Sequence, residues 1–110
     1  MFVISKSDSY LWPVKIETPA DGGKHNTETF DARFKRLPQS RIQEISANAD
    51  KIDDVTFARE ILVGWEGITE NDQPVPFSET TRDRLFEIPR FARTVVIAFY
   101  ESLAGARIKN

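Results

Sequence analysis

The sequence of 110 residues contains no cysteine and a single histidine. The absence of cysteine excludes disulfide bonds, thiolate chemistry and most zinc sites, and it suits a reducing compartment. His25 lies in a glycine-rich turn beside Lys24 and Asn26, where we expect a solvated surface role. No Ser-His-Asp arrangement can be argued from this histidine, so the sequence offers no nucleophile and base pair.

Phosphate-binding and calcium-binding patterns are also missing. Gly22-Gly23 is too short to cradle a phosphate, and no P-loop or dinucleotide fingerprint occurs. The acidic residues Glu66, Glu70 and Asp72 lack the alternating oxygen ligands, the central glycine and the closing glutamate of a calcium loop. We therefore expect no catalytic residues, no cofactor and no metal, and the protein is not expected to be an enzyme.

No excess of one charge and no long hydrophobic run is present. The 15 basic and 17 acidic residues are interspersed and give a net charge of -2, so there is no electrostatic footprint for nucleic acid. The most basic stretch holds Arg33, Lys35, Arg36 and Arg41, and we interpret it as a solvated face, with docking of an acidic partner as the alternative. No apolar run reaches the roughly 18 residues of a membrane span, and the apolar run at the start is too short for a signal peptide. We expect a cytoplasmic protein with no nucleic-acid or membrane partner.

What the sequence does contain is an ordinary globular composition, with 40% hydrophobic and 29% charged residues. It predicts one domain over residues 1–110, with a hairpin over about 10–37 and a helical part over about 38–106. The pattern of hydrophobic residues changes from a period of two to a period of 3.6 at Pro38. The expected fold class is therefore α+β, an N-terminal antiparallel β-hairpin followed by about four α-helices.

The hairpin is predicted from two alternating segments, Tyr10 to Glu17 and Thr29 to Leu37, joined by turn-forming residues over Thr18 to Asn26. The residues expected on its inner face are Tyr10, Trp12, Val14, Ile16, Phe30, Ala32 and Phe34. We expect Glu28 and Asp31 to form a solvated strand face. Because an isolated hairpin is marginal in water, either the chain's own helices or a neighbouring subunit must cover the aromatic face.

Capping and proline signals mark the predicted helices. The first helix begins at Pro38 and ends near Asn48 to Asp50, and the second is capped by Asp53 or Asp54 and ends near Trp65. Ser78 caps the third helix, Glu79 to Phe86, and Pro89 opens the last one, which runs from Arg90 to about Ala104. The second helix includes the stretch Phe57 to Trp65, is expected to be central to the fold, and has Gly64 as its ending signal. The segment Glu66 to Pro76 is predicted to be an ordered loop.

Two predicted helices leave the role of large apolar residues open. Trp65 is either a core anchor or a binding hot spot. In the last helix, Phe91, Val95, Phe99 and Leu103 form a core-facing stripe, whereas Ile97, Tyr100 and Ala104 lie on another side. That second side is covered by the same chain, or it is where a partner or another copy docks. The candidate partner-binding residues are Trp12, Phe34, Trp65, Ile97 and Tyr100.

Several segments in order carry a resemblance to a known family. They read WPVKIETPADGG, TFDARFKRLPQSRIQEI, FAREILVGWEGI, PVPFSE and IPRFARTVVIAFYESLAGARIKN. The most specific pieces are FKRL, the VGW that precedes an acidic residue and glycine, and the terminal AFYESLAGARIKN. Together they cover nearly the whole chain, and the chain resembles the tail assembly chaperones of long-tailed bacteriophages and prophages.

The resemblance implies a non-enzymatic assembly factor that acts in the host cytoplasm. Such proteins keep the tail tape measure protein soluble, help to recruit tail tube subunits and are absent from the finished virion. The resemblance also implies self-association and, in many members, a longer form made by ribosomal frameshifting, which carries a domain for the tube subunit. It transfers no binding residue to a numbered position here. The alternatives are a structural minor tail component and a generic protein-interaction adaptor.

Overall fold

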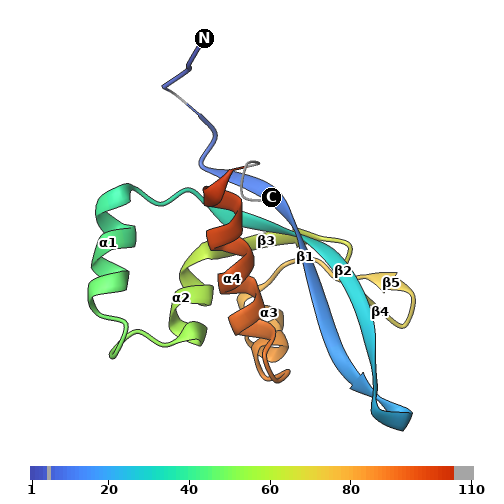
Figure 1. Cartoon of the computed structure of the whole chain (residues 1–110). Coiled ribbons are helices and arrows are strands. Elements are labelled where there is room, and N and C mark those ends of the chain that lie inside the picture. The colour runs from blue at the N-terminus through green and yellow to red at the C-terminus, as the bar shows by residue number, and fades with distance from the viewer. Residues whose placement is uncertain (5, 106–110) are drawn as a thin grey trace.

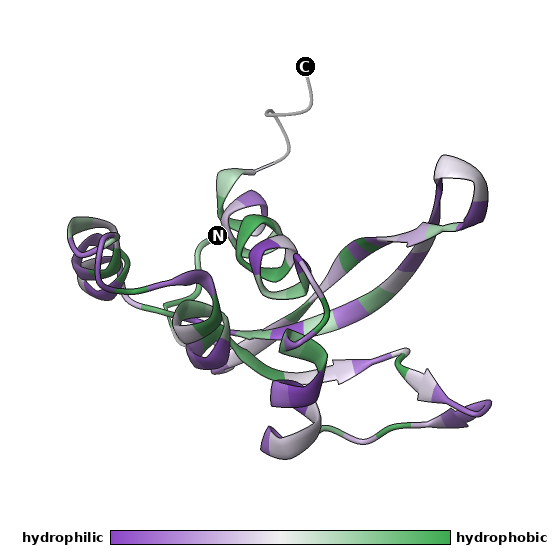
Figure 2. Cartoon of the chain, turned by 90° about the horizontal axis from the view of Figure 1, so that it is seen from below, coloured by the Kyte–Doolittle hydropathy of each residue, from purple (hydrophilic) through white to green (hydrophobic). Residues whose placement is uncertain are grey.

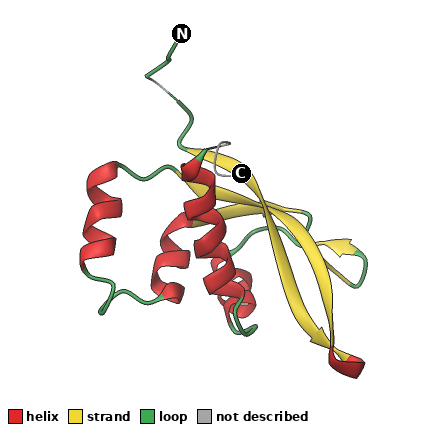
Figure 3. Ribbon diagram, in the orientation of Figure 1, coloured by secondary structure: helices red, strands yellow, loops and turns green. Residues whose placement is uncertain are grey.

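A three-stranded antiparallel sheet with helices packed on one face organises the computed structural model, which describes residues 1–4 and 6–105 (Figure 1). The sheet has the order β1-β2-β3, and it is formed by β1 (Ser9–Ala20), β2 (Lys24–Lys35) and β3 (Leu62–Glu66). The helices of the described chain are α1 (Gln39–Ala47), α2 (Asp54–Ile61), α3 (Glu79–Phe86) and α4 (Phe91–Ala104). The predicted α+β class with four helices after an N-terminal hairpin is confirmed (Figure 3).

The β1–β2 hairpin is longer than the sequence predicts. Its pairing runs from Ser9 opposite Lys35 to Ala20 opposite Lys24, so most of the predicted loop belongs to the strands. The remaining turn is a short 3-10 segment, η1 (Asp21–Gly23), in which both glycines have positive φ, a conformation that costs glycine little. The end of the hairpin projects beyond the helices (Figure 1).

The inner face of the hairpin is covered by helices of the same chain. Val14, Ile16, Phe30, Ala32 and Phe34 are all buried, whereas Tyr10 and Trp12 are partly buried against the same core. At these buried positions the chain's own helices cover the hairpin, so no neighbouring subunit is needed there. Alternation with a period of two therefore identified the inner face correctly.

The prediction of one helix through Trp65 is wrong. α2 ends at Ile61, and the chain continues as β3, in which Trp65 lies opposite Ala32 and Leu62 opposite Phe34. Pairing with β3 satisfies the backbone groups on the edge of β2, which would otherwise be exposed. In addition, Gly64 disfavours a helix but is tolerated in a strand at the margin of the sheet. A bulge between Arg33 and Phe34 adjusts the register. Gly64 is thus a strand residue opposite Arg33, not a helix ending.

The segment after β3 is also more regular than the loop expected there. It contains a small hairpin of β4 (Thr69–Glu70) and β5 (Gln73–Pro74), joined through Asn71 and Asp72. Both turn residues have positive φ, 52° and 63°, which asparagine and aspartate tolerate better than most residues. Viewed from below, this hairpin lies across from the β1–β2 hairpin (Figure 2).

The helix boundaries follow the capping signals closely. Asp53 Oδ1 accepts a hydrogen bond from the Thr56 amide at 2.8 Å, and Ser78 Oγ accepts one from the Thr81 amide at 3.1 Å. α4 begins one residue later than expected, because Arg90 has a φ of 70° and stands outside the helix. None of the helices in the described residues is long and apolar enough to cross a membrane.

The core lies between the sheet and helices α2 and α4. The ring of Phe99 packs edge-on against Phe34 and Phe57, with centroid distances of 5.5 and 5.7 Å. α1 stands apart from this core (Figure 1) and is joined to it chiefly by the buried Ile45 and by Arg41, which bonds to Glu60 of α2. The arrangement leaves one side of α4 uncovered.

Candidate functional site

The uncovered side of α4 carries exposed apolar side chains on a regular element. Ile97, Tyr100 and Leu103 are 44%, 38% and 50% exposed, and we call these three residues the α4 face. The Tyr100 ring lies on the buried Phe57 ring at 5.6 Å, which fixes its orientation at the surface. The α4 face is therefore a set of apolar side chains supported from below by the core.

Leu103 was expected in the core and is exposed instead. At the end of α4 the inward position is taken by Ser102, whose hydroxyl lies 2.6 Å from the Tyr10 hydroxyl of β1. The inward-facing stripe of α4 therefore runs through Val95, Phe99 and Ser102. Its last two residues are three positions apart, whereas a spacing of four would have led to Leu103. This shift moves Leu103 to the same side of the molecule as Tyr100.

An exposed apolar arm leaves the domain near the α4 face. Met1, Phe2, Val3 and Ile4 precede β1 and are 119%, 81%, 56% and 90% exposed. The Tyr10 to Ser102 contact places the start of β1 at the last turn of α4, and the arm projects from this end of the molecule (Figure 1). Consecutive exposed apolar residues are unusual on a monomer surface.

The structure separates the sequence-predicted partner-binding residues into two groups. Ile97 and Tyr100 lie side by side on the α4 face. Phe34 has 0% exposure, so it is a core residue and presents no surface to a partner. Trp12 is half-buried on the inner side of β1.

Trp65, like Phe34, is a core residue. It is 9% exposed, its Nε1 donates a hydrogen bond to the Val75 carbonyl at 2.8 Å, and its ring meets that of Phe77 at 4.8 Å. Both ends of the indole are therefore occupied within the chain. Of the two roles considered for Trp65, the structure places it as a core anchor.

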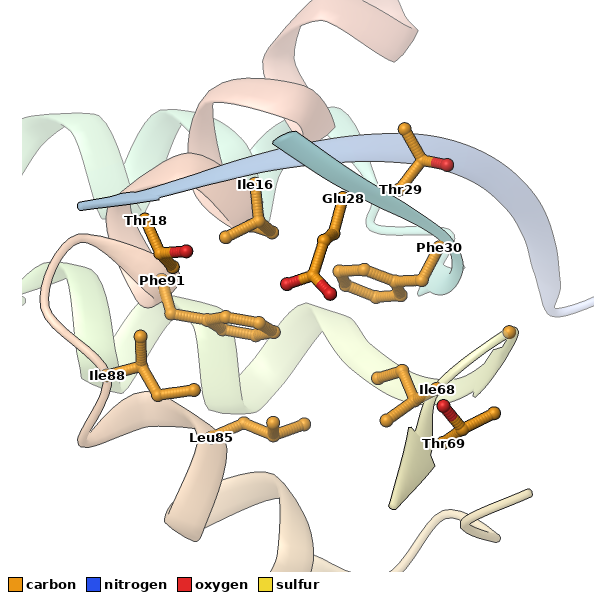
Figure 4. Close-up of a pocket in the computed structure, with 11 residues that line it drawn as sticks. Ile16, Thr18, Glu28, Thr29, Phe30, Ile68, Thr69, Leu85, Ile88 and Phe91 are labelled. Atoms are coloured by element: carbon orange, nitrogen blue, oxygen red, sulfur yellow. The ribbon is translucent and has the colours of Figure 1, made fainter. Parts of the chain in front are cut away.

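A groove that sequence reasoning missed lies between the β1–β2 hairpin, the β4 segment and the corner between α3 and α4 (Figure 4). Its cavity volume is about 280 Å³. The lining residues are Ile16, Thr18, Glu28, Thr29, Phe30, Gly67, Ile68, Thr69, Leu85, Ile88 and Phe91. They come from separate parts of the chain, and no single segment carries a pattern that would reveal them.

The walls of the groove carry both apolar side chains and threonines, and one carboxylate is directed into it. The rings of Phe30 and Phe91 are stacked at 5.6 Å and 10° between planes. The Glu28 carboxylate points into the groove between these two side chains and Ile16 (Figure 4). Glu28 and Asp31, expected on one solvated face, lie on opposite faces of β2. Glu28 is on the same face as the buried Phe30, and Asp31 lies on the outer side.

Some of the charged residues of the described chain form surface ion pairs. Arg41 donates to Glu60 at 2.8 and 2.7 Å and to Glu44 at 2.6 Å, and its hydrogen bond holds the pKa of Glu60 below the ordinary value. Arg41 is therefore engaged on α1 and is not part of one basic patch with Arg33. Within residues 1–4 and 6–105, no group of three or more His, Asp or Glu side chains could hold a metal ion.

Comparison with protein-family models, with curated proteins and with solved structures finds no significant match to this chain. The resemblance to tail assembly chaperones consequently rests on the sequence segments alone, and the surfaces described above are the structural observations to set beside it.

Proposed function

We propose that this protein is a bacteriophage tail assembly chaperone. It binds the tape measure protein in the host cytoplasm, helps to recruit tail tube subunits to it and leaves before the virion is complete. The observation that carries the proposal is the α4 face, where Ile97, Tyr100 and Leu103 are exposed on one side of a helix that the core holds in place.

The α4 face suits the partner that this function requires. A tape measure protein is a long, helix-rich chain whose apolar stripes are exposed until the tail tube encloses them. A helix with an apolar stripe packs against another helix through side chains at spacings of three and four residues. Ile97 and Tyr100 have that spacing, and Leu103 extends the same side by one turn. The binding function needs no catalytic group.

The proposal predicts a gene for a tape measure protein beside this gene, and it is tested by co-expression of the two proteins. We expect the wild-type protein to keep the tape measure protein in the supernatant and to copurify with it. Ile97→Glu places a charge on the α4 face and should abolish both effects. Val63→Glu is the matched control, because Val63 is 40% exposed but lies on the outer side of β3.

Two outcomes would contradict the proposal. If the wild-type protein does not bind the tape measure protein, the chaperone function fails. If mass spectrometry finds this protein in purified virions, it is a structural minor tail component instead. Equal loss of binding in Ile97→Glu and Val63→Glu would remove the α4 face as the binding surface while leaving the function open to other surfaces.

We also propose a longer, frameshifted form for the recruitment of the tail tube protein. This proposal comes from the resemblance to tail assembly chaperones, and the codons of Lys109 and Asn110 can supply a run of adenines on which tRNAs re-pair after slipping back one base. These residues lie outside the described part of the chain. A gene without a slippery run there, or with an immediate stop in the minus-one frame, would exclude the longer form.

A further inference from the structure

Strand β1 has a long free edge. In the order β1-β2-β3 it pairs with β2 along one side only, over twelve residues from Ser9 to Ala20. Among the described residues, no backbone hydrogen bond joins β1 to any segment other than β2. A long free edge is a template on which a strand of another chain can add. We infer that Pro13 and Pro19 protect this edge, so that the sheet does not extend through β1.

The places of the two prolines along β1 determine where their missing donors lie. In an antiparallel pair, the backbone groups of successive residues point alternately toward the paired strand and away from it. A proline has no N–H, so a proline directed at β2 would interrupt the pairing. The pairing runs from Ser9 to Ala20 without a register shift. Pro13 and Pro19 therefore direct their nitrogen atoms to the free edge.

The free edge is consequently short of hydrogen-bond donors. The residues whose backbone groups point outward are those at the odd positions of β1, namely Ser9, Leu11, Pro13, Lys15, Glu17 and Pro19. Because Pro13 and Pro19 donate nothing, the outward donors form two separate runs, Ser9 with Leu11 and Lys15 with Glu17. A strand that adds to a sheet binds through consecutive main-chain hydrogen bonds. At this edge it would meet an empty position after every second donor.

Charge adds to the protection between the two prolines. Lys15 and Glu17 are both exposed, and an added strand would bring its own side chains beside them. Charged side chains, lysine above all, are typical of edge strands that do not accept a further strand. The other residues of this part of β1 are aromatic or β-branched and favour pairing, namely Tyr10, Trp12, Val14 and Ile16. Without its prolines, β1 would therefore be a good strand for association.

The opposite edge of the three-stranded sheet is protected differently. β3 has five residues, and its pairing with β2 is disturbed by the bulge between Arg33 and Phe34. A short edge strand and a bulge each limit strand addition. The prolines of this sheet all lie in β1, the strand that combines length with a free edge. The inference rests on this geometry and does not depend on the proposed chaperone function.

The direction of the backbone groups is tested by amide hydrogen exchange of the wild-type protein, followed by nuclear magnetic resonance. The amides of Val14 and Ile16 bond to β2, whereas those of Lys15 and Glu17 point outward. We expect the outward amides to exchange at least about tenfold faster, because exchange of the bonded amides requires the strand to open. Equal protection of the two pairs would overturn the inference, since the edge would then be covered.

Substitution of the prolines should open the edge in a graded way. Pro13→Thr joins the two runs into five consecutive outward donors from Ser9 to Glu17, whereas Pro19→Thr only extends the second run to three. Both prolines are exposed and threonine suits a strand, so we expect both variants to fold. At high concentration, Pro13→Thr should raise the mean mass in light scattering about twofold or more, because two opened edges can pair. Pro19→Thr should raise it less.

Two comparisons separate strand addition from other causes of association. Pro38→Thr replaces an exposed proline that precedes α1, outside the sheet, and should leave the mass unchanged. The rise caused by Pro13→Thr should persist when Ile97→Glu is also present, because Ile97 lies on the α4 face. An equal rise in Pro38→Thr, loss of the rise with Ile97→Glu, or a folded Pro13→Thr variant of wild-type mass would each overturn the inference. If Pro13→Thr does not fold, an unchanged mass of folded Pro19→Thr overturns it.

Discussion

At the scale of single residues, Trp65 links the third strand to the segment that follows it. The indole nitrogen donates to the carbonyl of Val75, and the ring packs on Phe77. A buried indole N–H requires a partner, so this one bond positions the end of the loop that leads to α3. The same residue therefore joins the sheet to the segment that leads to α3.

Truncating Trp65 should destabilise the protein strongly. We expect Trp65→Ala to lower the free energy of unfolding by about 3–5 kcal/mol, because the large side chain leaves a cavity. Trp65→Phe keeps much of the packing and loses the hydrogen bond, so we expect a smaller loss of about 1–2 kcal/mol. Urea denaturation followed by circular dichroism measures both. An alanine variant as stable as the wild type would contradict the core placement.

Arg41 and Glu60 make the protein sensitive to acid. The hydrogen bond from Arg41 lowers the pKa of Glu60 in the folded state, so ionised Glu60 stabilises the fold above the pKa of the unfolded chain. This contribution disappears as the pH falls through the folded-state pKa. In Arg41→Met, the pKa of Glu60 should return toward its ordinary value, and the stability should depend less on pH in the acid range.

Denaturation midpoints measured from neutral to acidic pH test this expectation. The difference between the wild type and Arg41→Met should be largest near neutrality and should vanish in strong acid. Lys51→Met is the matched control, because Lys51 is exposed shortly before α2 and forms no ion pair with the described residues, so its pH profile should match that of the wild type. Parallel profiles for all three proteins would show that the Arg41–Glu60 pair contributes nothing.

At the scale of elements, local signals predicted most of the helices and the hairpin. The caps at Asp53 and Ser78 and the alternation around Phe30 depend on neighbouring residues, which a sequence displays directly. The stretch Leu62 to Glu66 is different, because Ile61, Leu62 and Trp65 fit a helical stripe and are also buried in the strand. Only the free edge of β2 decides between the two, and that edge is a property of the assembled sheet.

The same reasoning explains which parts of the candidate site were predictable. Ile97 and Tyr100 could be recognised because they share one helix and lie off its main stripe. The groove around Glu28 could not be recognised, because its walls come together only when the hairpin, β4 and the α3–α4 corner have packed. Phe34 was misassigned because hydrophobic alternation identifies the inner face but not which residues on it stay accessible.

The Ser78 cap gives a prediction for α3. This helix has eight residues, and Leu85 in its last turn lines the groove, so the position of the helix determines part of one wall. We expect Ser78→Ala to lower the free energy of unfolding by about 1 kcal/mol, because the Thr81 amide loses its acceptor. Amide hydrogen exchange should become faster along α3. Thr80→Ala, at the second residue of α3, is the control and should change neither the free energy of unfolding nor the rate of amide exchange appreciably.

At the scale of the whole molecule, the shape is less compact than the chain length requires. The radius of gyration is 15.1 Å, compared with about 13 Å for a compact domain of this length. The hairpin end, α1 and the N-terminal arm all project from the core (Figure 1). Projecting elements and an uncovered helix face give the chain more surface for association than a monomer of its size normally exposes.

We expect the protein to form at least a dimer at micromolar concentration through the α4 face, with the apolar arm of residues 1–4 adding to the contact. A symmetric pair brings the same apolar patch of two copies together and removes both from water. Ile97→Glu should lower the mass measured by light scattering and leave the helical circular dichroism intact, because Ile97 is 44% exposed. Val63→Glu should change neither measurement.

Binding of the proposed partner, the tape measure protein, gives a further test of the predicted dimer. If the tape measure protein uses the α4 face, it competes with the second copy, so adding it should convert dimers into mixed complexes that contain one chain per binding segment. Self-association would then protect the apolar face until its partner is synthesised. A wild-type protein that stays monomeric at high concentration would contradict the dimer. A dimer that persists unchanged when the tape measure protein binds would show that the two contacts use different surfaces.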